Sequence, residues 1–254
     1  MGAEELLASP SGLAWIGGIA LVAGFAHGLS GFGFPVISTP MVALFTDVRT
    51  AVMVTLFPNI VVNVLSAVTG SGWRESLQRY WYLPAVVLVG TIVGTQVVIF
   101  APAGPLRLLL AAVIVVYLQQ ERFRRVDWSV IVRHPGRAGV VLGLLAGFLS
   151  GTVNVMLPPL LIYFTTLQVG QVVMTQVMNG CFLVGKVSQA AVFAAHGQFS
   201  AGVLTGIVPI CGLALAGYLG GRRLQPRIKE SAYRAFLRGV LWIMAAVLVV
   251  QAFA

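Results

Sequence analysis

Lys186 is the side chain whose position in this sequence most clearly predicts chemistry. It lies well inside an apolar segment, residues 171–195, and we expect every other Arg, Lys, Asp and Glu to lie in a loop or near a helix end. A charge at the centre of a membrane-spanning helix costs about 2.5–3.5 kcal/mol on insertion scales, so it indicates a transport pathway. The alternative is a lysine whose long side chain snorkels to the membrane interface.

Polar side chains accompany Lys186 on one face of its helix. Thr175, Asn179 and Gln189 fall near that face, and residues 50–70 carry a similar one. Each Asn or Thr alone could join two helices through a hydrogen bond of about 0.6 kcal/mol. Two facing sets could instead bind a ligand, and we assign to substrate binding Lys186, Thr175, Asn179, Thr55 and Asn59, with Asn63 and Ser66 on the same face as the last two.

Two short stretches interrupt the hydrophobic sequence with residues that end helices. The first is GLSGFGFP, Gly28 to Pro35, and the second is SGTVNVMLPP, Ser150 to Pro159. Unwound backbone at membrane depth persists only where protein buries it or where it lines a wet cavity, and transporters place substrates there. The alternative is a kink or close packing at small residues. We assign to the substrate site Ser30, Gly31, Phe32, Gly33, Ser150, Gly151 and Asn154.

These breaks favour an anionic ligand. Helices that begin after them, at about residues 34–46 and 156–167, would direct free amides and positive dipole ends into the site. Lys186 adds a full positive charge, and no acidic residue lies nearby to bind a cation. We therefore expect a small anion as substrate and no metal site.

The composition excludes a soluble globular domain. Of 254 residues, 58% are hydrophobic and only 9% are charged, whereas soluble domains are about 25% charged. The chain is therefore predicted to be an all-α, multi-pass membrane protein. Glu4 and Glu5 replace the basic start of a cleavable signal peptide, so the first hydrophobic stretch should stay in the mature protein.

The two breaks belong to an internal duplication. A shift of about 120 residues superposes Ser30 on Ser150 and Asn59 on Asn179. We expect an N-terminal repeat (1–120), a basic linker (121–137) and a C-terminal repeat (138–254). Each repeat would consist of a broken or re-entrant helical hairpin, whose tip reaches the midplane, and three transmembrane helices. A parallel arrangement of eight single passes is the alternative.

The basic residues predict the orientation. They gather at about 74–79, 121–137 and 221–238, which should be cytoplasmic, so that both termini lie outside and the two repeats have opposite topology. The +9 net charge thus reflects topology rather than nucleic-acid binding. Residues 122–137 could form an interfacial helix on anionic lipid or a plain basic linker.

No motif indicates an enzyme. The sequence lacks His-Glu-x-x-His, paired intramembrane carboxylates and Gly-x-Ser-x-Gly, so we expect no catalytic residues and no cofactor. His27 lies beside the first break. It could couple transport to protons or be a satisfied core histidine.

The duplicated tips, Gly28 to Pro35 and Gly147 to Gly151 followed by Pro158-Pro159, resemble the paired motif of the TauE/SafE family of sulfite and organosulfonate exporters. Many members have a richer Gly-x-Gly-Gly-Gly run. The resemblance implies a carrier in the bacterial cytoplasmic membrane that exports a small sulfur-containing anion such as sulfite or sulfoacetate. The alternatives are an anion channel of the same architecture and a non-transporting membrane scaffold subunit.

Overall fold

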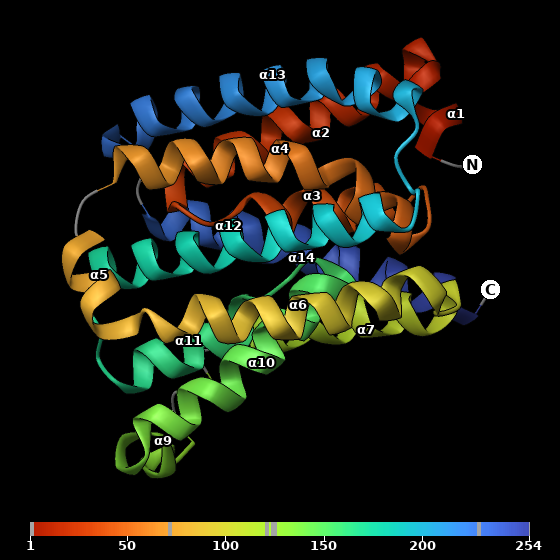
Figure 1. Cartoon of the computed structure of the whole chain (residues 1–254). Helices are drawn as coiled ribbons and strands as arrows, with labels where there is room; N and C mark the ends of the chain where they lie inside the picture. The colour runs from red at the N-terminus through yellow and green to blue at the C-terminus, as the bar shows by residue number, and fades with distance from the viewer. Residues whose placement is uncertain (1–2, 71–72, 120–121, 123–125, 228–229, 254) are drawn as a thin grey trace.

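The computed structural model describes residues 3–70, 73–119, 122, 126–227 and 230–253, and these parts are almost entirely α-helical (Figure 1). Six helices are long and apolar enough to cross a membrane. The chain is therefore an all-α polytopic membrane protein, as the composition predicts. The six spans are α2 (Pro10–Ser30), α4 (Val48–Thr69), α6 (Tyr82–Phe100), α10 (Pro135–Val153), α12 (Gln171–Ala195) and α13 (Ala201–Leu224).

Shorter elements connect and complete these spans. Among them α3 and α11 have ten residues each, about 15 Å of helix, which is half of a membrane crossing. Their bounds are α1 (Ala3–Ala8), α3 (Phe34–Ala43), α5 (Trp73–Tyr80), α7 (Ala103–Leu118), α9 (Ser129–Arg133), α11 (Leu157–Thr166), η1 (Gln225–Arg227) and α14 (Glu230–Phe253).

Local sequence explains where several helices begin. Ser9, Asp47 and Ser200 are N-caps, and the side chain of each accepts a hydrogen bond from the backbone N–H of the third residue of α2, α4 and α13, respectively. Pro10 and Pro158 stand in first turns, where a missing N–H costs nothing.

The same order of elements occurs twice along the chain. A long helix, a ten-residue helix and another long helix make up α2–α3–α4 and again α10–α11–α12. The first residues of the short helices, Phe34 and Leu157, and of the long helices, Val48 and Gln171, both differ by 123 (157 minus 34, 171 minus 48). The expected offset of about 120 is therefore corrected to 123. Three residues make almost one helical turn, so the polar periodicity alone did not separate the two values.

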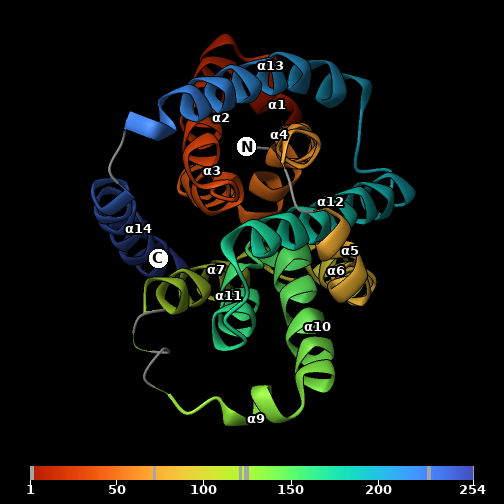
Figure 2. The same ribbon diagram turned by 90° about the vertical axis from the view of Figure 1, so that its left-hand side faces the viewer.

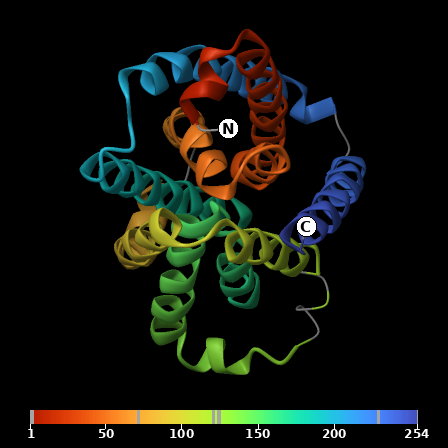
Figure 3. The same cartoon turned by 90° about the vertical axis from the view of Figure 1, so that its right-hand side faces the viewer.

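Each half lends one helix to the other. In the end-on views α13 lies beside α2, and α10 lies beside α6 (Figures 2 and 3). Glycines allow both close approaches, because a Cβ at any of them would collide with backbone of the partner helix. They are Gly24 and Gly28 on α2, Gly217 and Gly221 on α13, Gly90 and Gly94 on α6, and Gly147 and Gly151 on α10.

The two ends of the bundle differ in their content. Figure 1 shows both termini at one end and the loops with α5 and α9 at the opposite end. α9 has only five residues, and α10 begins at Pro135, so the last residues of the predicted linker, up to Arg137, form the first turn of this long helix. The rest of the expected 122–137 helix lies partly outside the described residues.

The tips of the two breaks lie at different levels along the bundle. Gly31 lies against Thr175, the fifth residue of α12, and Asn154 bonds Thr55, the eighth residue of α4. α4 and α12 start at opposite ends of the bundle (Figure 1). The tips thus pass each other because α2 and α10, with 21 and 19 residues, are long enough to cross fully.

Candidate functional site

The side chain of Lys186, on α12, is fully buried and reaches the C-terminal end of α10. Its Nζ donates to the backbone oxygen of Ser150 (3.2 Å) and to Oε1 of Gln189 (2.5 Å). Gln189 Nε2 donates in turn to the oxygen of Gly151 (2.9 Å). The last carbonyls of a helix have no partners within it and carry the negative end of its dipole, so a cation and an amide stabilise them well. Burial excludes the snorkelling alternative for Lys186.

The charge of Lys186 has neutral surroundings. Among the Arg, Lys, Asp and Glu side chains that the structure describes, it is the only buried one. Both of its hydrogen-bond acceptors are uncharged oxygens. A buried ion is costly without a partner of opposite charge, so this position favours an anion as ligand.

Two buried hydroxyls without partners lie at the same junction of α6, α10 and α12. They are Ser150 Oγ and Thr91 Oγ1. A Cβ added at Gly185, next to Lys186, would stand 3.1 Å from Thr91 Oγ1. Thr95, one turn further along α6, instead donates its hydroxyl to the oxygen of Thr91 (2.7 Å). Sequence reasoning missed Thr91, although its place between Gly90 and Gly94 on a closely packed helix face was a signal.

Asn154 connects the C-terminal break with the N-terminal half. Its Nδ2 donates to Thr39 Oγ1 (2.7 Å) and to Thr55 Oγ1 (3.1 Å), and all three residues are buried. The backbone of Asn154 is left-handed, with φ of 64°, and closes α10. Thr39, on α3, had not been predicted, because nothing in its local sequence sets it apart from a packing threonine.

The remaining predicted Asn residues form separate contacts between and within helices. Asn179 Nδ2 donates to Ser66 Oγ (3.1 Å), which ties α12 to α4. Asn63 Nδ2 donates to Asn59 Oδ1 within α4, and Asn59 Nδ2 has no partner. Asn59 precedes Ser66 by two turns and Lys186 follows Asn179 by two turns, so the antiparallel pairing brings Asn59 to the depth of Lys186.

The N-terminal break is built from backbone more than from side chains. Gly31 closes α2 in a left-handed conformation (φ of 83°), and its N–H donates to the oxygen of His27 (2.7 Å). Ser30 Oγ donates to the oxygen of Ala26, and Phe32 is half-buried. Gly33 is the N-cap of α3. Gly31 lies against Thr175, whereas the hydrogen bonds of Lys186 go to Ser150 and Gln189 and not to this break.

A comparison with known families decides the relationship. The model of the sulfite exporter TauE/SafE family matches residues 16–248, nearly the whole chain. The chain belongs to the TauE/SafE family. Members of this family are membrane exporters rather than enzymes. Family membership and the six apolar helices together make this chain a multi-pass membrane protein of the transporter class. The family supports a sulfur-containing anion as its type of substrate. Searches of curated proteins and of solved structures found no match.

His27 occupies a position in this TauE/SafE protein that favours a neutral ring. It is fully buried, and its Nδ1 accepts a hydrogen bond from the N–H of Phe34, the first residue of α3 (3.4 Å). Its ring packs edge-on against Tyr218. An imidazolium would turn a second N–H toward that amide and toward the positive end of the α3 dipole.

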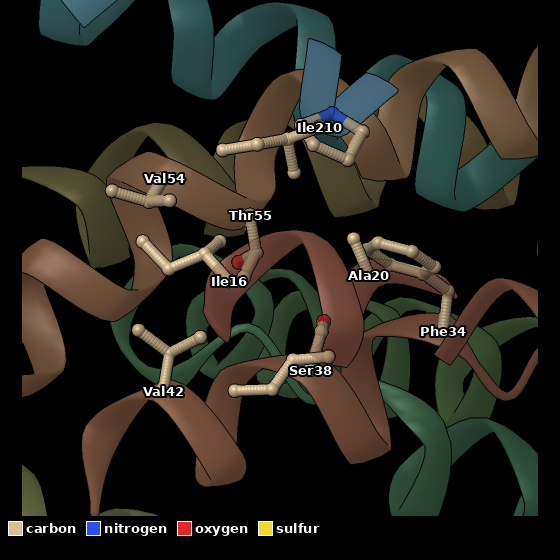
Figure 4. A pocket seen from close by; sticks show the side chains of 10 residues that line it. Ile16, Ala20, Phe34, Ser38, Val42, Val54, Thr55 and Ile210 are labelled. Atoms are coloured by element: carbon tan, nitrogen blue, oxygen red, sulfur yellow. The ribbon is translucent and has the colours of Figure 1, made fainter. Parts of the chain in front are cut away.

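A pocket between α2, α3, α4 and α13 is lined chiefly by aliphatic side chains (Figure 4). Ser38 and Thr55 are its polar lining residues. Such a lining suits an apolar group better than an anion. This pocket therefore does not fit the anion expected at Lys186, although Thr55 in its lining also accepts a hydrogen bond from Asn154. Within the described residues no three His, Cys, Asp or Glu side chains gather as metal ligands.

Proposed function

We propose that this chain exports a small sulfur-containing anion, sulfite or an organosulfonate such as sulfoacetate, across the bacterial cytoplasmic membrane. The observation that carries the proposal is Lys186, a buried cation with only neutral acceptors around it. A bound anion supplies the missing countercharge. Family membership supports the class of substrate.

The substrate site of the proposal centres on the C-terminal break and the helices around it. Lys186 provides the charge, and Ser150, Gly151 and Asn154 provide the end of α10. Asn59 lies at the same depth through the pairing of α4 with α12. Thr55, Thr175 and Asn179, with Ser30, Gly31, Phe32 and Gly33 at the other break, would line the path on either side.

Alternating access by two inverted repeats is the proposed mechanism. The repeated element order, the 123-residue offset and the exchange of α6 and α13 support two structurally equivalent halves. Because each half packs one of its helices against the other, a rocking motion would open the two ends in turn. The basic loops would face the cytoplasm and both termini the outside, as the positive-inside rule requires.

Counterflow of labelled sulfite in proteoliposomes tests this function. Vesicles that contain the purified chain and unlabelled sulfite should transiently concentrate labelled sulfite, and the initial rate should saturate. A channel would give flux without counterflow, and a scaffold subunit would give no flux above empty vesicles. Either of the last two results contradicts the carrier proposal.

A further inference from the structure

We infer that Lys186, Ser150 and Thr91 form a three-donor site that accepts a headgroup with three oxygens and a single negative charge, as in a sulfonate or hydrogensulfite, and rejects the corresponding dianion. The inference rests on the proposed function, because it names the ionic form that the same site takes. It also adds Thr91, a residue of α6, to the site.

The number of available donors matches such a headgroup. An ammonium has three N–H donors, and Lys186 uses two of them for Ser150 O and Gln189 Oε1. The hydroxyls of Ser150 and Thr91 are buried and have no partner in the described structure. One N–H and two O–H groups therefore remain at this junction. A buried donor left without an acceptor destabilises the protein, so these three groups indicate a ligand rather than packing.

The available charge sets the valence of the ligand. Lys186 carries one positive charge, and no second cation is buried among the residues that the structure describes. A headgroup with one negative charge gives a neutral pair with Lys186, whereas a headgroup with two negative charges leaves a net negative charge at this junction, in a medium of low dielectric constant. Four helices pack against α12, namely α4, α5, α6 and α10. Their titratable side chains lie near helix ends and not at this junction: Arg49, Arg74, Glu75, Arg79, Tyr80, Tyr82 and Arg137.

Methanesulfonate and methylphosphonate provide a matched pair of probes. Both have a methyl group and three oxygens, but methanesulfonate stays a monoanion, whereas methylphosphonate becomes a dianion as the pH rises. Dissociation constants of both are measured by calorimetric titration of the full chain in detergent over a pH series. Any titration of the protein itself affects both probes and cancels in the ratio of their constants.

The affinity for methylphosphonate relative to methanesulfonate should fall about tenfold per pH unit above the second ionisation of the phosphonate, because only its monoanion binds. A ratio that stays constant or moves toward methylphosphonate overturns the inference. If neither probe binds while sulfite counterflow persists, this site is wrong and the proposed function stands. If methanesulfonate binds with the expected selectivity but no sulfite is transported, the export proposal fails and the site stands.

Two threonines on α6 test the role of Thr91. Thr91→Val should weaken methanesulfonate binding about tenfold while the chain folds normally, since the lost hydroxyl has no protein partner. Thr95→Val is the matched control, because that buried hydroxyl bonds its own helix, and it should leave the affinity unchanged. Equal effects of the two substitutions on affinity would contradict the assignment.

Discussion

The break after α2 and the break after α10 end in the same left-handed backbone turn, at Gly31 and at Asn154. Their surroundings differ. The end of α10 is held by a lysine, a glutamine and an asparagine that reaches α3 and α4. At the end of α2, His27 accepts a hydrogen bond from the first N–H of α3, and Gly31 has no side chain to reach other helices. At the corrected offset, Asn63 stands where the C-terminal half has Lys186.

This difference suggests a division of labour between two halves of one architecture. Both breaks expose helix ends, but a buried charge occurs at only one of them among the described residues. The proposed duplication would provide two equivalent positions, and one charge is enough for one monoanion. We therefore expect the C-terminal break to set ligand affinity and the N-terminal break chiefly to shape the path.

The largest expected effect should be equal in the two halves. Gly28→Ala would drive a methyl group into the backbone oxygen of Tyr218, and Gly147→Ala would do the same at Val87. Overpacking typically costs 1–3 kcal/mol, and more where two helix backbones must separate. We expect both variants to lose several degrees of thermal stability or to fail to give a monodisperse peak in size-exclusion chromatography.

Gly18→Ala is the control for this pair. It lies on the same helix as Gly28, and a Cβ there meets nothing within 4 Å. Alanine favours a helix over glycine by about 1 kcal/mol, so this variant should be as stable as the parent. If only one of the two crowded positions is sensitive, the equivalence of the halves in packing is wrong.

The second-largest effect should differ between the two halves. Lys186→Met is expected to abolish sulfite counterflow and the stabilisation by ligand, about 2.7 kcal/mol at 100 times the dissociation constant. Asn63→Ala, at the equivalent position, should keep counterflow and lose about 1 kcal/mol of stability with its hydrogen bonds. Thermal unfolding with and without sulfite measures both. Loss of transport in Asn63→Ala with full activity in Lys186→Met would reverse the comparison.

A smaller effect concerns the bond between the C-terminal tip and the N-terminal half. Asn154→Gly keeps the left-handed turn but removes the hydrogen bonds to Thr39 and Thr55, and it should destabilise the chain by about 1–3 kcal/mol. Asn154→Ala loses the same hydrogen bonds and also forces alanine into the left-handed conformation, which should cost about 1–2 kcal/mol more. Unfolding curves of the two variants separate side chain from backbone. If Asn154→Gly matches the parent, the bond between the halves contributes no stability.

Sequence reasoning could find the parts of the site that stand out against apolar neighbours. Lys186 and Asn154 were predicted because charge and polarity are rare inside membrane segments. Thr91 and Thr39 were not, because a lone threonine in a helix more often bonds its own backbone, and only packing decides otherwise. The break positions were likewise visible, since glycine and proline end helices locally.

The positions of the two tips along the bundle could not be predicted from the sequence, for a different physical reason. Composition sets the length of an apolar run, but it does not determine how many residues of that run continue a helix that packs against other helices. α2 and α10 continue because glycines let α13 and α6 cover their small faces closely, and those partners come from the other half of the chain. Such long-range pairing leaves no local pattern beyond the glycine spacing.

The smallest expected effect concerns His27, whose position beside the first break makes it a candidate for proton coupling. Its Nδ1 accepts a hydrogen bond from the N–H of Phe34, so the ring satisfies the first N–H of α3, a helix whose N-cap residue, Gly33, has no side chain to do so. Asn can offer an oxygen in nearly the same place and does not titrate. His27→Asn should therefore keep sulfite counterflow and its pH profile, with a loss of stability of about 1 kcal/mol or less. His27→Leu, which cannot accept this hydrogen bond, is the control for the cap and should be less stable than His27→Asn. A pH profile that flattens in His27→Asn while counterflow persists would instead identify His27 as the coupling group and give the N-terminal break a chemical role of its own.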